Sequence, residues 1–255
     1  MKLALLQLAP MGPITAPPDA LRQQLRALAA AGVDLAVLPE LLLPGYNQPQ
    51  AHGDLLANAL AAMAALAQEA GLAIAFGWAE REGDAVYNAA TLVDRAGRTA
   101  LHYRKLQLFG PMERASFAPG TAAPTVCTLG GIRIGLLICY DIEFPEHARA
   151  VARQGCDLLL VPTANPAGFE HVQRLLVPAR AYENRLTVAY ANYAGPDGDI
   201  TFGGGSVIAG PDGGVLATAG PAPATLVVDL QRIGTYDAAL LSTQLADLNQ
   251  PDGGA

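Results

Sequence analysis

Three side chains that could do chemistry follow apolar segments that resemble buried strands. Glu40 follows DLAVLP, Lys105 follows ALHYR and Cys139 follows GIRIGLLI. Polar residues at the end of a buried strand lie at the edge of a sheet, where α/β folds bind their ligands. A carboxylate, a cation and a thiol at such an edge indicate chemistry through a cysteine nucleophile.

Cys139 lies between a predicted strand and a helix that Pro145 opens. A sharp strand-to-helix turn exposes its side chain above the sheet and offers backbone N–H groups to an anion. A thiol in that place becomes a nucleophile if a base adjoins it, and otherwise is a buried structural cysteine. We interpret Cys127 and Cys156 as structural.

Glu40 and Lys105 are ambiguous when each is taken alone. Partial burial would raise the pKa of Glu40 and suit it to proton transfer, but a solvated glutamate at the start of a loop has the same local sequence. Lys105 alone could be a solvated cation. Glu113 lies in a long loop bounded by glycine and proline, and long loops in compact domains are often functional.

Composition narrows the classes of partner. The 255 residues carry a formal net charge of −7, so nucleic acid and anionic membranes are not expected as partners. Three cysteines without a C-x-x-C pair predict a reducing, cytoplasmic location. No apolar run approaches the ~20 residues that span a bilayer, and MKLALLQLAPMG is interpreted as a first buried strand rather than a signal peptide.

Cofactor signals are weak. The four histidines have no metal-ligand spacing, and the GGGS segment lacks the lysine of a phosphate-binding loop and the spacing of a dinucleotide fingerprint. We therefore expect neither a metal nor an organic cofactor. The scattered histidines also disfavour a metal-dependent enzyme.

The elements that must position these residues alternate between strands and helices. No composition typical of a linker interrupts them, so we predict one domain over residues 1–255, with mixed sheets covered by helices. Residues 229–248 are expected to form a terminal helix or an extended arm, and residues 251–255 to be frayed. The predicted helices are 20–31, 55–70, 145–154 and 170–184, and the predicted strands are 2–8, 33–38, 72–78, 85–93, 99–103, 124–129, 132–138, 157–161, 186–191, 205–209, 215–217 and 225–228.

Taken together, the segments resemble the nitrilase superfamily of carbon–nitrogen hydrolases. LPE, YRK and ICYD…FPE occur in the family's order and supply Glu40, Lys105 and Cys139. Supporting matches are GYN after LPE, the E-x-x-x-F-x-P-G stretch that begins at Glu113, VPTAN and ARAYENR. Each segment is weak alone, but their ordered conjunction is specific.

The resemblance implies an α/β fold, an α-β-β-α sandwich of two mixed sheets, and homodimers or higher homo-oligomers. It implies Glu40 as proton shuttle, Lys105 as oxyanion stabiliser, Cys139 as nucleophile and Glu113 as a second, supporting glutamate. True nitrilases typically have C-W-E at the nucleophile, whereas this chain has C-Y-D, as amidases do.

These observations predict an enzyme that hydrolyses small, aliphatic amides to a carboxylic acid and ammonia through a cysteine thioester. The alternatives are a nitrilase or N-carbamoyl amidohydrolase of the same family, and a catalytically silent binding protein with the same fold. Four residues beside the motifs could line the substrate pocket or only pack, and these are Tyr46, Tyr140, Phe144 and Asn165.

Overall fold

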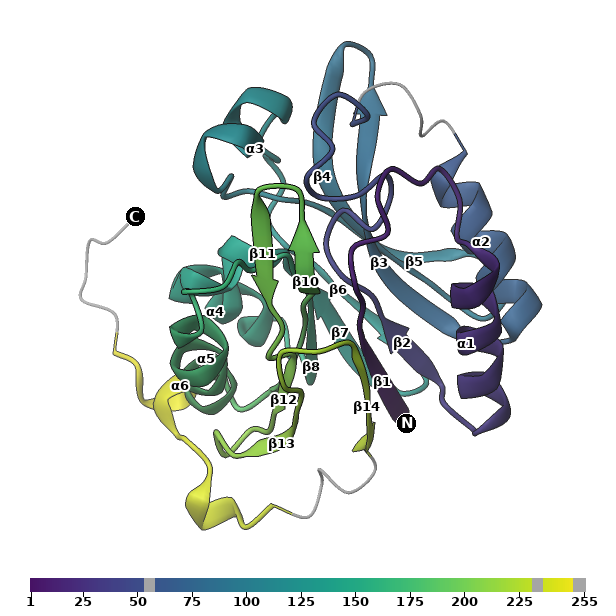
Figure 1. Ribbon diagram of the computed structural model, residues 1–255. Coiled ribbons are helices and arrows are strands. Elements are labelled where there is room, and N and C mark those ends of the chain that lie inside the picture. The colour runs from purple at the N-terminus through teal and green to yellow at the C-terminus, as the bar shows by residue number, and fades with distance from the viewer. Residues whose placement is uncertain (53–57, 231–235, 250–255) are drawn as a thin grey trace.

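Two six-stranded sheets face each other in the computed structural model, and helices cover their outer faces (Figure 1). The structure describes residues 1–52, 58–230 and 236–249. This arrangement confirms the predicted α-β-β-α sandwich. The organisation of residues 1–255 as one domain stays a prediction.

The first sheet has the strand order β14-β1-β2-β3-β4-β5. Strands β1, β2 and β3 are parallel, and the outer pairs are antiparallel. Its strands are β1 (Lys2–Gln7), β2 (Leu35–Val37), β3 (Ala73–Glu82), β4 (Ala85–Val93), β5 (Thr99–Arg104) and β14 (Ala224–Asp229).

The second sheet has the order β13-β12-β9-β8-β7-β6, with β7, β8 and β9 parallel. Its outer pairs are antiparallel, so both sheets place three parallel strands among antiparallel neighbours. Its strands are β6 (Val126–Leu129), β7 (Ile132–Leu136), β8 (Leu158–Pro162), β9 (Thr187–Ala191), β12 (Val207–Ala209) and β13 (Val215–Thr218).

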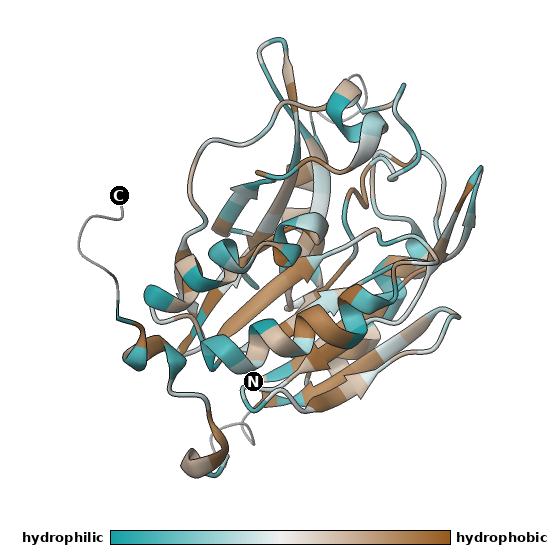
Figure 2. Cartoon of the chain, turned by 90° about the vertical axis from the view of Figure 1, so that its left-hand side faces the viewer, coloured by the Kyte–Doolittle hydropathy of each residue, from teal (hydrophilic) through white to brown (hydrophobic). Residues whose placement is uncertain are grey.

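Strand alternation explains how the layers hold together. In β1, Leu3 and Leu5 join the cluster that also contains Leu160 of the second sheet, whereas Ala4 and Leu6 join the cluster beneath the helices. Successive side chains of a strand point to opposite faces, so a strand covered on both sides is apolar throughout. Figure 2 shows this as hydrophobic strands inside and hydrophilic outer faces on the helices.

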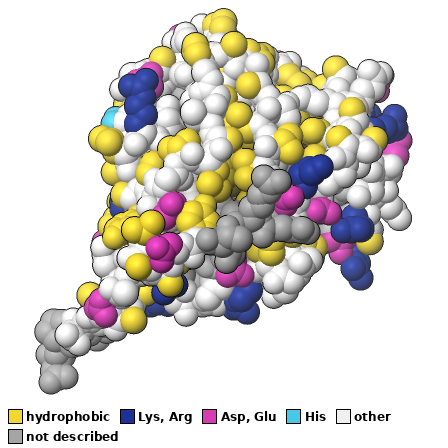
Figure 3. All heavy atoms as spheres, turned by 90° about the horizontal axis from the view of Figure 1, so that it is seen from below, with side chains coloured by type: hydrophobic (Ala, Val, Ile, Leu, Met, Phe, Trp, Pro, Cys, Tyr) yellow, Lys and Arg dark blue, Asp and Glu magenta, His cyan; other side chains and the backbone are white. Residues whose placement is uncertain are grey.

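The helices pack in pairs on the outside of each sheet. α1 (Asp19–Ala30) and α2 (Ala59–Ala70) cover the first sheet, and α4 (Pro145–Arg153) and α5 (Val177–Asn184) cover the second (Figure 1). The start of the helix predicted at 55–70 lies outside the described residues. Figure 3 shows Lys and Arg interspersed with Asp and Glu on the lower face of the molecule.

The predicted helix over 170–184 is divided in the structure. Residues Val172–Leu176 form a π-helical turn, η2, and α5 starts at Val177. Pro178 stands in the first turn of α5 and has no N–H to donate, so the preceding turn does not continue as a regular α-helix.

Two elements were absent from the sequence prediction, namely α3 (Gly110–Ser116) and the hairpin of β10 (Ala194–Asp197) with β11 (Ile200–Gly203). After residue 235 the described chain forms a 3-10 turn, Ala238–Leu240, and the short α6 (Gln244–Asp247), which contacts α5. This segment is therefore an arm with short turns. Residues 251–255 lie outside the described residues.

Candidate active site

Three segments distant in sequence meet between the two sheets. Lys105 Nζ lies 2.6 Å from Glu40 Oε1 and 2.7 Å from Glu113 Oε1. All three side chains are fully buried. A buried ammonium between two carboxylates is charge-paired on both sides, which is what burial of such groups requires.

Glu40 is placed by the turn that follows β2. Its backbone N–H donates to the carbonyl of Thr163, 3.3 Å away, and the next residue, Leu41, has φ of 46°. The turn passes directly over Gly77 of β3, where a Cβ would lie 2.6 Å from Glu40 Cα. Glycine at this position leaves the space that lets the turn approach the sheet.

Cys139 opens the 3-10 turn η1 (Cys139–Glu143) with φ of 44°, in the left-handed region. The carboxylate of Asp141 fixes this turn because it accepts hydrogen bonds from the backbone N–H of Ile138 (3.3 Å) and Gln107 (2.9 Å) and from the hydroxyl of Tyr103 (3.0 Å). Asp141 thereby joins the turn at Cys139 to the chain on either side of residue 105. Cys139 is 9% exposed.

Glu113 of α3 has donors on both carboxylate oxygens. Its Oε1 accepts from Lys105 Nζ and from the Tyr46 hydroxyl at 2.8 Å, and its Oε2 accepts from the backbone N–H of Phe109 at 2.9 Å. A carboxylate held by three donors is well placed to anchor Lys105.

The two oxygens of Glu40 differ. Oε1 accepts hydrogen bonds from Lys105 and from the Asn88 side chain at 2.7 Å, whereas the buried Oε2 has no partner in the described part of the chain. An unpaired buried oxygen costs about 1–3 kcal/mol, so its presence calls for an explanation.

Burial and charge set the protonation states of the cluster. Burial raises the pKa of Glu40 to about 7, with Lys105 opposing and Glu113 adding to the shift. Burial also raises the pKa of the Cys139 thiol well above its usual value, and nearby Glu40 contributes. Burial alone would lower the pKa of Lys105, but Glu113 and Glu40 raise it above its usual range. At neutral pH the thiol is therefore neutral, Lys105 is a cation, and Glu40, with a pKa of about 7, is close to half ionised.

Aromatic side chains gather beside Cys139. The Tyr140 ring makes edge contacts with Phe144 (centroids 5.0 Å apart) and Phe109 (5.2 Å), and Phe109 contacts Phe169 (5.7 Å). Phe109 and Phe169 did not stand out in the sequence, because neither lies in a motif on its own.

The four predicted substrate contacts fall into two groups. Tyr140 and Phe144 are next to Cys139, in the aromatic cluster. The Tyr46 hydroxyl donates to Glu113 and so contacts the charged cluster. The Asn165 amide donates to the carbonyl of Phe169 and to Gln173 Oε1. Substrate contact stays a prediction for all four.

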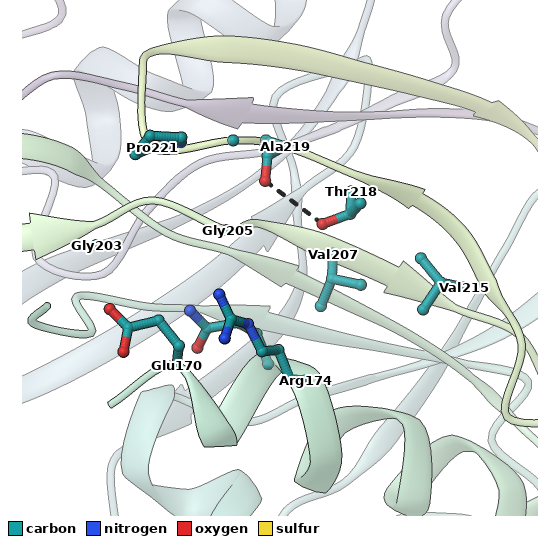
Figure 4. Close-up of a pocket in the computed structure, with 11 residues that line it drawn as sticks. Glu170, Arg174, Gly203, Gly205, Val207, Val215, Thr218, Ala219 and Pro221 are labelled. Carbon is teal, nitrogen blue, oxygen red and sulfur yellow. Dashed lines mark hydrogen bonds between the residues drawn. The ribbon is translucent and has the colours of Figure 1, made fainter. Parts of the chain in front are cut away.

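A cavity of about 510 Å³ lies between η2 and the second sheet (Figure 4), and its lining does not include the charged cluster or Cys139. Glu170 and Arg174 reach into it from one side, and Val207 and Val215 line it from the second sheet (Figure 4). Two residues of its lining are hydrogen-bonded to Asn165: Gln173 Oε1 accepts from the Asn165 amide, and the backbone N–H of Gly203 donates to the Asn165 carbonyl at 3.3 Å.

A comparison of sequences shows which family this chain belongs to. The profile of the family described as carbon–nitrogen hydrolase matches residues 2–239. The chain belongs to this family. The carbon–nitrogen hydrolase described here is 40% identical over 253 residues to a protein of Pseudomonas protegens named hydrolase in pqqF 5'region, covering 97% of this chain and 88% of the relative.

Two further relatives are amidases. An (R)-stereoselective amidase of Pseudomonas sp. is 38% identical over 237 residues, covering 90% of this carbon–nitrogen hydrolase and 85% of the relative. An amidase of Nesterenkonia sp. AN1, solved as a glutamate-to-glutamine mutant after Michael addition of acrylamide at its active-site cysteine, superimposes with a TM-score of 0.85. It is 37% identical, over 90% of this chain and 93% of that one.

The described residues lack two kinds of feature. No helix among them is both long and apolar enough to cross a membrane. Within the same residues, no group of three or more His, Cys, Asp and Glu side chains could hold a metal ion.

Proposed function

We propose that this carbon–nitrogen hydrolase cleaves small amides to a carboxylic acid and ammonia through a thioester on Cys139. The observation that carries the proposal is the free oxygen of Glu40, buried beside Lys105 and close enough to the thiol to raise its pKa. A base with one unoccupied oxygen, next to a nucleophile at a strand end, is the arrangement that nucleophilic catalysis needs.

In the first half-reaction, Glu40 Oε2 accepts the thiol proton and the thiolate attacks the amide carbonyl. Lys105 has three N–H donors, and two of them are directed at Glu40 and Glu113, so the third is available to the oxyanion. The backbone N–H of Tyr140, in the turn after the nucleophile, is the proposed second donor.

Glu40 then returns the proton to the departing nitrogen, since an amide anion is too basic to leave unprotonated. Ammonia departs and the acyl group remains on Cys139 as a thioester. Glu40 next takes a proton from water and the hydroxide attacks the thioester. The C–S bond then breaks, Glu40 returns the proton to the Cys139 sulfur, and the carboxylic acid is released. A pKa of about 7 suits a carboxyl group that must both accept and donate near neutral pH.

The aromatic cluster beside Cys139 is evidence that the acyl group of the substrate is small. Phe109, Tyr140 and Phe144 contact one another beside Cys139, and a surface of aromatic rings suits a small, aliphatic acyl group. The amidases among the relatives, and the C-Y-D form of the nucleophile segment, favour an amide over a nitrile.

We also propose that the protein acts in the cytoplasm as a homo-oligomer that pairs through the face of residues 170–184. Leu175 and Tyr182 on this face are 66% and 39% exposed. Apolar side chains gathered on one surface are typical of an interface. Light scattering of the wild type and a Leu175→Lys variant tests this, and equal monomer masses for both would contradict it.

The function is tested by ammonia release from a panel of short aliphatic amides, the matching nitriles and N-carbamoyl compounds. We expect the amides to be hydrolysed fastest and the Cys139→Ala variant to be inactive on all of them. Cys156→Ala is the matched control, because Cys156 is also buried but lies away from the charged cluster. Preference for nitriles, or activity in Cys139→Ala, would contradict the proposal.

A further inference from the structure

Asn88 of β4 contacts two of the three charged residues of the cluster, Glu40 and Lys105. Its side-chain Nδ2 donates to Glu40 Oε1 at 2.7 Å, and its backbone carbonyl accepts from the backbone N–H of Lys105 at 2.8 Å. Asn88 is 1% exposed. We propose that Asn88 is a positioning residue that fixes the orientation of the Glu40 carboxylate so that one oxygen stays free to exchange protons, an inference that rests on the proposed function.

The hydrogen bonds of Glu40 carry the first step of the argument. Lys105 and Asn88 both donate to Oε1, and no described group donates to Oε2. An oxygen that already accepts two hydrogen bonds, one from a cation, is a poorer proton acceptor than its bare neighbour. The proton from the thiol or from water is therefore taken by Oε2.

Lys105 alone does not fix the orientation of the Glu40 carboxylate. The terminal torsion of a glutamate is broad, so a carboxylate with one donor can turn about it at little cost in energy. The ammonium itself rotates and is shared with Glu113. A second donor from β4, in a fixed direction, fixes the plane of the carboxylate and therefore the direction of the oxygen that has no donor.

Asn88 has one unsatisfied atom that supports a role beyond packing. Its Oδ1 is buried and has no hydrogen-bond partner among the residues that the structure describes. Turning the amide over would place Oδ1 against the carboxylate of Glu40, where two oxygens repel. The amide orientation is thus set by Glu40, at the expense of its own carbonyl.

The same hydrogen bond acts on the acidity of Glu40. Burial is the largest influence and raises the pKa of Glu40, and the hydrogen bond from Asn88 is among the influences that lower it. Removing this donor raises the pKa further. Because Glu40 must be ionised to accept the thiol proton, the acid limb of the activity profile then moves to higher pH.

Two variants test the proposal. Asn88→Ala removes the donor, and Asn88→Asp keeps the size and shape of the side chain while it replaces the donor by a second carboxyl. We expect each to lower kcat about tenfold to hundredfold, to change KM less than about threefold, and to move the acid limb of kcat/KM upward by about one pH unit.

Thr91→Val is the matched control. Thr91 is on the same strand and is fully buried. Its side chain makes two hydrogen bonds, with Trp78 and His102, and neither partner belongs to the charged cluster. Its loss should lower stability but leave the acid limb where it is in the wild type. An equal shift in Thr91→Val would show that the effect is general loosening of β4, and would overturn the proposal.

Alkylation of Cys139 by iodoacetamide provides a readout that needs no turnover. Its rate depends on removal of the thiol proton, so its pH profile should also move upward in Asn88→Ala and Asn88→Asp. A shift in alkylation without amide hydrolysis by the wild type would refute the proposed function and support the positioning role. Unchanged profiles in both Asn88 variants, beside an active wild type, would refute the positioning role alone.

Discussion

Replacing Lys105 by alanine should destabilise the protein as well as inactivate it. The ammonium lies 2.6 and 2.7 Å from two fully buried carboxylates, and no other cation is paired with either of them in the described structure. Removing one member of a buried ion pair leaves an uncompensated charge and costs about 3–5 kcal/mol. The loss of an oxyanion donor should lower kcat about 10²–10³-fold in whatever fraction stays folded.

The destabilisation should depend on pH with a defined sign. The folded-state pKa of Glu40 is about 7, above the 4.5 of an exposed glutamate, and loss of the cation raises it further. A carboxyl group whose pKa is raised in the folded protein contributes its full stabilisation at pH values below its unfolded pKa. This stabilisation is lost as the pH rises through the folded pKa. The variant therefore loses stability relative to the wild type as pH rises above about 7, by at most about 1.4 kcal/mol per pH unit for one proton.

Urea unfolding followed by the fluorescence of Trp78, the single tryptophan, measures these differences. We expect Lys105→Ala to lose at least about 1 kcal/mol more at about pH 8.5 than at about pH 6, and Lys105→Ala combined with Glu40→Gln to recover most of this difference. Arg22→Ala is the control, because its ion pair with Glu69 is exposed and worth about 0–1 kcal/mol. A loss below about 1 kcal/mol, or one equal at both pH values, would refute the reasoning.

Three further predictions follow from single contacts. The kcat/KM of the wild type should rise with pH through about 7 as Glu40 ionises, and a pH profile with its acid limb near the usual glutamate value would contradict this. Gly77→Ala places a Cβ 2.6 Å from Glu40 Cα and should lower the activity, and it should lower the free energy of unfolding by about 1–3 kcal/mol. Gly220→Ala is the control, because its Cβ meets no atom within 4 Å, and it should change neither quantity. Asp141→Ala removes the acceptor that holds the turn at Cys139 and should lower stability by about 1–3 kcal/mol and slow alkylation of the thiol, and wild-type values for both would exclude this role.

Strands and their polar ends were predictable because the signal is local. The strand predicted at 85–93 has the bounds of β4, and the strands before Glu40 and Cys139 are shorter than predicted but in place. A strand that is covered on both faces can be recognised in a single sequence, because it is a run of apolar residues that ends at a polar one. The convergence of those ends was expected from the resemblance to the family.

Two elements of the fold, α3 and the β10–β11 hairpin, were not predicted from the sequence, for different reasons. α3 has only seven residues and starts at Gly110 and Pro111, so it shows no helical periodicity. The β10–β11 hairpin did leave a signal, since its two turn residues are Gly198 and Asp199, a Gly-Asp pair typical of tight hairpin turns, with Gly198 at φ of 63°.

The supporting contacts of the site could not be read from the sequence. Asn88 reaches Glu40 because β3 lies between β2 and β4, and Tyr46 reaches Glu113 from 67 residues away. Such contacts depend on sheet order, which no local pattern specifies. The one available signal was an asparagine inside a mostly apolar strand, because a buried polar side chain needs a partner.

The central claim is that the sulfur of Cys139 carries the acyl group during turnover. Rapid quenching of the wild type in the presence of a short aliphatic amide, followed by peptide mass spectrometry, tests it most directly. The account predicts an acyl adduct on the peptide that contains Cys139, at higher occupancy when deacylation is slowed. An adduct on Cys127 or Cys156 instead, or amide hydrolysis by Cys139→Ala at the wild-type rate, would contradict it.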